Sequence, residues 1–390
     1  MSAREIEEHA GYVRDTAKLE AYERALAEVV RPGDSVLDLG SGTGVLGLLA
    51  ARAGARIVYA VDSGSIIGVA ADIAARNDLD QRIVHIRETS SRLRLPEPVD
   101  VVVCDQIGGA VYDAGVLDYF DDARRRLLRP EAVLVPGSFR LLAAPVSAGL
   151  WHEIVEVWST RPAGFDMEAM AELAVNTEYR PRLGAEHFLG QPAEWGSIPS
   201  DHVEPVTGSA RLTIERPGVL NGIAGMFIAQ LSPSVELTNC PLLPHSFDRW
   251  QNFYPLPEAV EVAEGDSVEV RFDIRPKSYL ATWTVGVHRR CRPDDPIHSR
   301  QSTVLGKLLT PDDIAAADGS AVPRLTPLVE ADRFILGLVD GVRTERSIVE
   351  QTWTEHGSLF CSRQEVESRV RNLTARHARS VPPWPTSPTA

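Results

Sequence analysis

The sequence has few cysteines, and none of them is spaced from another as in a metal-binding or redox motif. Cys104, Cys240, Cys291 and Cys361 are the only four, they lie far apart, and no C-x-x-C pair occurs. This pattern argues against a disulfide framework and against a cysteine-rich zinc site. It is typical of thiols in a reducing cytoplasm, and we expect no metal site.

Long apolar runs and a leader segment are also missing. No stretch reaches the length of a transmembrane helix, and the first residues, Met-Ser-Ala-Arg-Glu-Ile-Glu-Glu, are too charged for a signal peptide. The sequence therefore predicts a cytoplasmic protein without a membrane partner.

Positive charge is in deficit. The chain has 40 lysines and arginines against 54 acidic residues, which gives a formal net charge of −14 at pH 7. A general nucleic-acid-binding protein needs a basic face, so we expect no nucleic-acid partner, whereas a cationic substrate or a basic peptide is compatible with this charge. The 390 residues, 44% of them hydrophobic, are enough for about two to three domains with a sizeable core.

The strongest local signal is the stretch from Val36 to Gly44. Its first residues form a short apolar run that predicts a buried parallel strand. Gly40, Gly42 and Gly44 then form a G-x-G-x-G turn before a helical pattern. Glycines let the backbone adopt positive φ and approach a ligand closely, at a helix N-terminus that points N–H groups toward it.

Two acidic residues indicate which cofactor this turn binds. Asp38 lies within the first strand, and Asp62 ends the second expected strand, residues 56–61. A carboxylate at the second position is the usual partner of a ribose diol. The spacing differs from the G-x-G-x-x-G of dinucleotide sites, and the Lys-Ser/Thr pair of a phosphate loop is absent. We therefore predict an S-adenosylmethionine site.

The periodicity changes along the chain and predicts an α/β protein with several parts. Alternating strands and helices indicate a Rossmann-like cofactor domain, with further strands at 82–86 and 99–104. The expected parts are N-terminal helices covering the cofactor (1–30), the Rossmann-like domain (31–138), an all-β barrel-like domain (139–300) with a helical insertion near 160–197, a linker (301–324), a small winged-helix-like domain (325–378) and a disordered tail (379–390).

Three separated motifs resemble one known family. The N-terminal helix resembles the His-x-x-Met-Leu-x-Asp-x-x-Arg-x-x-x-Tyr motif of the protein arginine methyltransferases, in register at His9, Tyr12-Val13, Asp15, Lys18 and Tyr22. The segment Gly164–Met167 matches the dimerisation arm of that family, and His245–Gln251 matches its Thr-His-Trp loop. The resemblance covers about residues 5–290. It implies a class I methyltransferase core followed by a β domain, and it implies a homodimer.

The resemblance and the chemistry together assign cofactor contacts. Lys18, at the family's arginine position, is expected to pair with the methionine carboxylate. Asp38 is expected to orient the glycine turn or the methionine amine, and Asp62 to accept the ribose hydroxyls. The full set of predicted cofactor-binding residues is Tyr12, Lys18, Asp38, Gly40, Ser41, Gly42, Gly44, Asp62, Ser63, Ser90, Ser91 and Asp105.

The acceptor site departs from the family pattern. The family holds a substrate guanidinium between two glutamates, because a planar cation with five N–H donors prefers a carboxylate on each edge. Here the first position is Asp105, the second is Ala114 with Asp113 one residue early, and Arg249 replaces the histidine of the Thr-His-Trp loop. A permanent cation there would repel a guanidinium unless it pairs with an acid. The predicted catalytic residues are Asp105, Gln106, Asp113, Arg249 and Trp250.

These departures favour an amine as the methyl acceptor. A carboxylate and an amide oxygen can orient an amine, and an α-amine with a pKa near ~8 is partly neutral at physiological pH. Residues 335–344 also resemble small winged-helix domains that recognise leaders of ribosomally made peptides, although a structural cap or a dimer element fits equally well. We therefore predict an N-methyltransferase of a peptide amine, as in daptide-type peptide biosynthesis. The alternatives are an arginine N-methyltransferase of protein or free arginine, and a non-catalytic scaffold that binds the cofactor.

Overall fold

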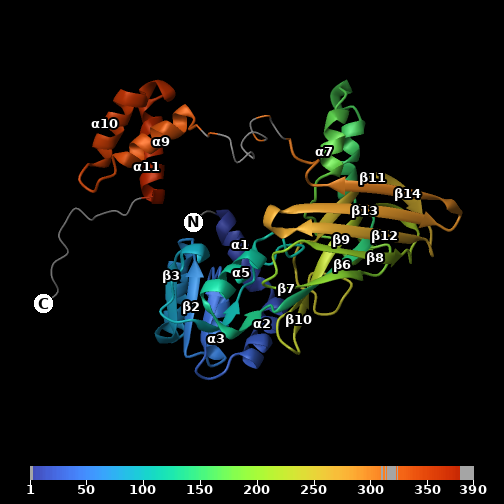
Figure 1. The fold of residues 1–390 in the computed structure, drawn as a ribbon, viewed down its shortest axis with the longest axis horizontal. Helices are drawn as coiled ribbons and strands as arrows, with labels where there is room; N and C mark the ends of the chain where they lie inside the picture. The colour runs from blue at the N-terminus through green and yellow to red at the C-terminus, as the bar shows by residue number, and fades with distance from the viewer. Residues whose placement is uncertain (1–2, 309–310, 312, 314–321, 323, 378–390) are drawn as a thin grey trace. The chain divides into compact units, whose positions relative to one another are not determined.

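The computed structural model describes residues 3–308, 311, 313, 322 and 324–377 (Figure 1). The chain divides into two compact units, Met1–Leu308 and Leu309–Ala390. The predicted tail and the central part of the predicted linker lie outside the described residues. No helix in the described part of the chain has both the length and the apolar character needed to cross a membrane.

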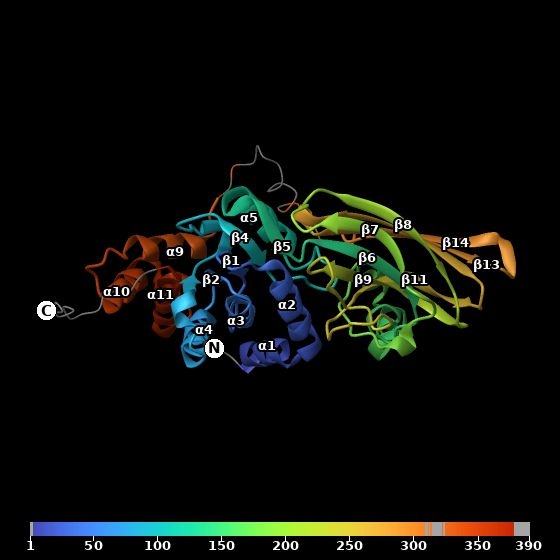
Figure 2. The same ribbon diagram turned by 90° about the horizontal axis from the view of Figure 1, so that it is seen from below.

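A five-stranded parallel sheet forms the first half of the larger unit. Its strands are β1 (Ser35–Leu39), β2 (Ile57–Asp62), β3 (Ile83–Arg87), β4 (Val99–Val103) and β5 (Leu128–Val135), in the order β3-β2-β1-β4-β5. Helices α3 (Val45–Arg52) and α4 (Ile66–Arg76) cover one face and α5 (Val116–Arg126) the other (Figure 2). The predicted Rossmann-like fold is confirmed.

The strand register brings the predicted site residues to one edge of this sheet. In the central strand, Asp38 lies beside Ala60 of β2 and Val103 of β4. The carboxyl ends of β1, β2 and β4 therefore meet at the edge where ligands bind in doubly wound sheets. Gly40, Asp62 and Asp105 follow or end these three strands.

The N-terminal segment is two helices, α1 (Ala3–Arg14) and α2 (Thr16–Val29). Asp15 separates them, because its side chain accepts a hydrogen bond from the backbone N–H of Lys18 at 3.1 Å and so caps α2. The cap fixes where α2 begins, and the buried face of α2 then includes Lys18 and Tyr22. A buried lysine needs a partner, which the site described below provides.

The second half of the larger unit is built from antiparallel strands. They are β6 (Ser138–Val146), β7 (Ala193–Pro199), β8 (Val206–Thr213), β9 (Gly218–Gln230), β10 (Glu236–Thr238), β11 (Asn252–Val262), β12 (Ser267–Arg275), β13 (Leu280–Arg289) and β14 (Arg292–Ser302). One sheet has the order β10-β9-β6-β7, with β11 also paired to β9, and the other β14-β13-β12-β8. Buried side chains of both halves form one continuous apolar core, so the β domain is packed directly against the parallel sheet.

A helical insertion projects from the β domain between β6 and β7 (Figure 1). It begins at α6 (Leu150–Ile154), ten residues before the predicted start, and includes α7 (Ala171–Val175). Trp151 anchors its base, since the ring is buried and its Nε1 donates to the Leu256 carbonyl at 2.8 Å. The tip carries an exposed apolar side chain, Phe165, which is 70% accessible to solvent.

The smaller unit contains three helices, α9 (Pro327–Gly337), α10 (Glu345–His356) and α11 (Arg363–His377). They enclose a small core of their own. Thr344 caps α10, with its Oγ1 accepting from the Ser347 N–H at 3.3 Å. The first helix ends at Gly337, and Asp340 forms a separate turn by accepting a hydrogen bond from the Val342 N–H. None of the described residues of this unit forms a strand, so the wing of the predicted winged helix is not seen among them.

Candidate active site

The glycine turn after β1 has the backbone that its sequence predicts. Gly40, Gly42 and Gly44 have φ values of +70°, +56° and +85°, a region that other residues rarely adopt. Gly40 is also crowded, because a Cβ there would lie 2.4 Å from Nε2 of Gln106. The turn therefore needs glycine for its conformation and for the close approach of the Gln106 side chain.

Asp38 holds this turn against the following helix. Its Oδ2 accepts hydrogen bonds from the Ser41 hydroxyl at 2.7 Å and from the Gly47 N–H at 2.9 Å. The carboxyl group is fully buried, and burial raises its pKa from 3.8 to about 6. Of the two predicted roles for Asp38, these contacts support the orientation of the loop.

The raised pKa of Asp38 gives a testable pH dependence. Between about pH 4 and pH 6 the folded protein binds a proton at Asp38 that the unfolded chain has already lost. The wild type should therefore lose stability relative to Asp38→Asn as the pH rises through this window, by at most about 3 kcal/mol. Denaturant unfolding of both proteins at pH 4 and pH 7 measures the difference, and a gap that is constant with pH would contradict the burial argument.

Asp62 holds the same turn from β2. Its Oδ2 accepts from the Gly42 N–H at 3.0 Å and its Oδ1 from the Gly64 N–H at 2.7 Å. Each carboxylate oxygen can accept a second hydrogen bond, and the Asp62 side chain lines two neighbouring cavities. It can therefore hold the turn and still accept hydroxyl donors from a ligand.

Two cavities lie at this edge of the sheet. The larger, of about 570 Å³, is lined on the far side of the turn by Val61, Ser63, Glu88, Ser90, Ser91 and Tyr119, among others. The smaller, of about 120 Å³, is lined by His9, Tyr12, Lys18, Ser41 and Asp105, among others. Gly40, Asp62 and Gln106 line both cavities.

The two cavities fit the two halves of S-adenosylmethionine. The larger offers carboxylates for a ribose diol and room for a base, whereas the smaller offers a buried lysine for a carboxylate. Ser90 belongs to a short turn that Arg126 of α5 holds by donating to the Ser90 carbonyl at 2.9 Å.

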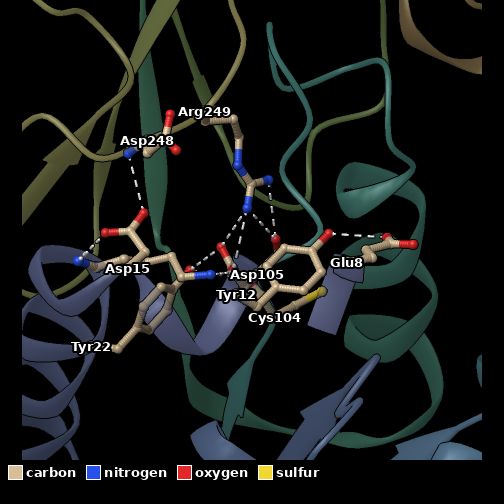
Figure 3. A network of polar contacts seen from close by, with 9 residues as sticks. Glu8, Tyr12, Asp15, Tyr22, Cys104, Asp105, Asp248 and Arg249 are labelled. Carbon is tan, nitrogen blue, oxygen red and sulfur yellow. Dashed lines mark hydrogen bonds and ion pairs between the residues drawn. The ribbon is translucent and has the colours of Figure 1, made fainter. Parts of the chain in front are cut away.

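Asp105, two residues after the end of β4, pairs with two cations, Lys18 and Arg249, and Figure 3 shows its contact with Arg249. Its Oδ2 is 2.5 Å from Nζ of Lys18, and its Oδ1 is 3.3 Å from Nη2 of Arg249. The exposed fractions of the side chains are 14% for Asp105, 4% for Lys18 and 5% for Arg249, so solvent screens these charges little. Tyr22 adds a hydroxyl 3.4 Å from Oδ1, and burial raises the pKa of this tyrosine so that it stays neutral. One negative charge thus faces two positive charges.

Asp113 does not share this cluster in its described contacts. Its carboxylate, 2% exposed, accepts from the N–H groups of Gly109 and Ala110 at 3.0 and 3.2 Å and pairs with Arg180 at 3.1 Å. These contacts fold the loop after β4 onto the β domain. Both Asp113 oxygens thus have partners in the loop or in Arg180, and its role as the second acid at the acceptor stays a prediction.

The other predicted acceptor residues lie on either side of Asp105. Gln106 faces the glycine turn and both cavities. Trp250 packs on the loop, since a Cβ at Gly109 would lie 2.7 Å from its Cδ1. Sequence reasoning missed Arg180 and Glu178, the latter a partly buried acid that accepts from the Tyr112 hydroxyl at 2.8 Å. Neither belongs to a motif, and the fold alone brings them to the loop.

Comparisons with known proteins agree with this architecture. The family described as ribosomal protein L11 methyltransferase (PrmA) matches residues 18–134. Protein arginine N-methyltransferase 6 of Xenopus tropicalis is 27% identical, over 72% of this chain and 89% of the relative. Arginine N(omega)-methyltransferase of Streptomyces achromogenes subsp. streptozoticus is 28% identical, over 67% of this chain and 74% of the relative.

Solved structures show the same fold. A Trypanosoma brucei PRMT1 enzyme-prozyme heterotetrameric complex with AdoHcy matches with a TM-score of 0.67 and 19% identity, over 75% of this chain and 97% of the other. Arabidopsis thaliana protein arginine methyltransferase 10 matches with a TM-score of 0.62 and 22% identity, over 76% and 97%. Taken with the glycine turn and the two cavities, these findings lead to one conclusion. The chain is an S-adenosylmethionine-dependent methyltransferase with the fold of the protein arginine methyltransferases.

Proposed function

We propose that this enzyme methylates an amine of a peptide, such as the terminal amine of a ribosomally made precursor. The observation that carries the proposal is that Asp105 pairs with Lys18 at 2.5 Å, while the Asp113 carboxylate accepts from the Gly109 N–H and pairs with Arg180. A guanidinium acceptor would need carboxylates on two edges. An amine needs only one or two acceptors for its hydrogens, which Asp105 and Gln106 provide.

The roles of the residues follow from the displacement chemistry. When bound, S-adenosylmethionine supplies a methyl group on a positively charged sulfur. Asp105 and the Gln106 amide oxygen accept the N–H groups of the acceptor and so direct its lone pair toward this methyl group. The two cations beside Asp105 disfavour a protonated acceptor, which promotes the neutral, nucleophilic amine. The proton that the new ammonium must lose passes to Asp105 or to water.

The cofactor contacts are part of the same proposal. Lys18 lines the smaller cavity while it pairs with Asp105, so a cofactor carboxylate would be a second partner for the lysine. Asp62 and Ser63 would border the ribose, and Ser90 and Ser91 the adenine.

Two alternatives are weighed against this proposal. The names of the relatives favour an arginine N-methyltransferase. The contact between the Arg249 guanidinium and Asp105 supports the same alternative, because it shows that Asp105 can pair with a guanidinium. A non-catalytic scaffold is set aside, because the relatives are methyltransferases and both cavities are present.

A matched pair of peptides tests the proposal. One has a free terminal amine and no arginine, and the other has a blocked terminus and one arginine. Labelled S-adenosylmethionine should methylate the first peptide with a kcat/KM at least about tenfold above the second. Transfer to the second alone would contradict the proposal.

We also propose that the smaller unit binds the leader of the peptide substrate, its three packed helices forming the recognition module. Deleting the residues after 320 should then raise KM for a leader-bearing peptide about tenfold or more, because the peptide loses a binding surface, and should leave kcat similar. A leaderless peptide is the control and should be unaffected. Unchanged KM for both would indicate a structural cap.

We further propose that the helical insertion pairs two copies of the chain. It exposes two apolar side chains two residues apart, Phe165 at 70% and Met167 at 38% of their surfaces, and such a pair can contribute to an interaction patch. Phe165→Asp should shift the mass measured by light scattering from dimer to monomer, because a charge would have to be buried in the interface. Val219→Asp, at a 39% exposed strand position, is the control. A dimer that survives Phe165→Asp would contradict this role.

A further inference from the structure

Arg249 is buried at the acceptor side of Asp105, although no motif of the fold requires an arginine there. Only 6% of its surface is exposed. Its Nη2 lies 3.3 and 3.4 Å from the two carboxylate oxygens of Asp105, and Nη1 donates to the Asp105 carbonyl at 3.4 Å. The guanidinium thus contacts both polar groups that Asp105 presents at this side (Figure 3).

Aromatic rings surround the same guanidinium. Its Cζ lies 5.1 Å from the ring centre of Phe247, 5.7 Å from that of Trp250 and 5.9 Å from that of Tyr12. The rings come from α1 and from the segment before β11, which are far apart in the sequence. A carboxylate together with three aromatic rings is an environment that binds planar cations. These groups form a site suited to a guanidinium, and the side chain of Arg249 occupies it.

We infer that Arg249 determines specificity by occupying the position that an arginine substrate would need. The inference rests on the proposed function and names the residue that enforces it. A second guanidinium would have to displace Arg249 from a buried position or share one carboxylate with two other cations. A neutral amine faces neither cost, because it is small and enters without charge.

The charge balance explains why Arg249 can be removed without disrupting Asp105. Lys18 remains at 2.5 Å, so the Asp105 carboxylate stays paired in a variant that lacks Arg249. Such a variant keeps a carboxylate and three rings around an empty cation position. A guanidinium from a substrate can then fill it.

Two variants and one small molecule test this inference. Arg249→Ala and Arg249→His should each gain about tenfold or more in kcat/KM for the arginine peptide over the wild type. Free guanidinium ion added to Arg249→Ala should reverse the gain, because it refills the position. Retained S-adenosylhomocysteine binding shows that each variant is folded. The matched control is Arg140→His, which removes an exposed arginine paired with Glu236.

The outcomes separate this inference from the proposed function. No gain for the arginine peptide in either folded variant, or a gain that guanidinium does not reverse, overturns the role of Arg249. This result leaves the proposed function standing if the wild type methylates the amine peptide. A wild type that prefers the arginine peptide overturns both. The inference is supported if kcat/KM for the arginine peptide rises in the Arg249 variants, falls again with guanidinium in Arg249→Ala, and stays at the wild-type value in Arg140→His.

Discussion

Replacing Asp105 by asparagine is expected to reduce methyl transfer by about 10²- to 10⁴-fold. The reason is that Asp105, which lines the smaller cavity and pairs with Lys18 and Arg249, is the carboxylate that we propose to contact the acceptor. An amide in its place cannot accept the acceptor proton or balance the two cations. Single-turnover rates with saturating cofactor measure the loss.

Cofactor affinity should change by no more than a few-fold in Asp105→Asn, since Lys18 remains in the smaller cavity and is released from its ion pair. Glu269→Gln serves as the control, because it removes an exposed carboxylate of β12 that pairs with Arg211 of β8. Turnover within threefold of the wild type in Asp105→Asn would contradict a role at the acceptor.

Replacing Asp62 by alanine should instead weaken cofactor binding by about 10- to 150-fold, with calorimetry as the measurement. Hydrogen bonds to charged groups contribute about 1.5–3 kcal/mol each, and Asp62 supports the turn through the Gly42 N–H as well as lining both cavities. Asp72→Ala on the exposed side of α4 is the control. Unchanged affinity in Asp62→Ala would remove this residue from the cofactor site.

The cofactor half of the molecule could be predicted from sequence because its signals are local. A strand, a glycine turn and an acid at the end of the next strand occur within 27 residues, from Val36 to Asp62. Glycine at positions 40, 42 and 44 permits the positive φ that the turn adopts. The break at Asp15 was not predicted, because the sequence shows the N-terminal stretch only as helical and the cap is seen in the structure alone.

The acceptor half could be predicted only in part, because its contacts join distant segments. Asp105 meets Lys18 across 87 positions and Arg249 across 144, and no spacing rule relates these residues. The sequence showed that Arg249 needed an acid but left Asp105 and Asp113 as equal partners. The fold decides between them, since the backbone of the loop turns the Asp113 carboxylate toward Gly109 and Arg180.

The most direct test of this account is to locate the methyl group on a natural substrate. Peptides encoded beside the gene would be incubated with the enzyme and S-adenosylmethionine, then fragmented in a mass spectrometer to place each added methyl. The account predicts a mass gain at a terminal amine, because Asp105, the carboxylate proposed to face the acceptor, is already paired with Lys18 and Arg249. A gain on an arginine side chain would show that Asp105 suffices to hold a guanidinium and would contradict the proposed acceptor.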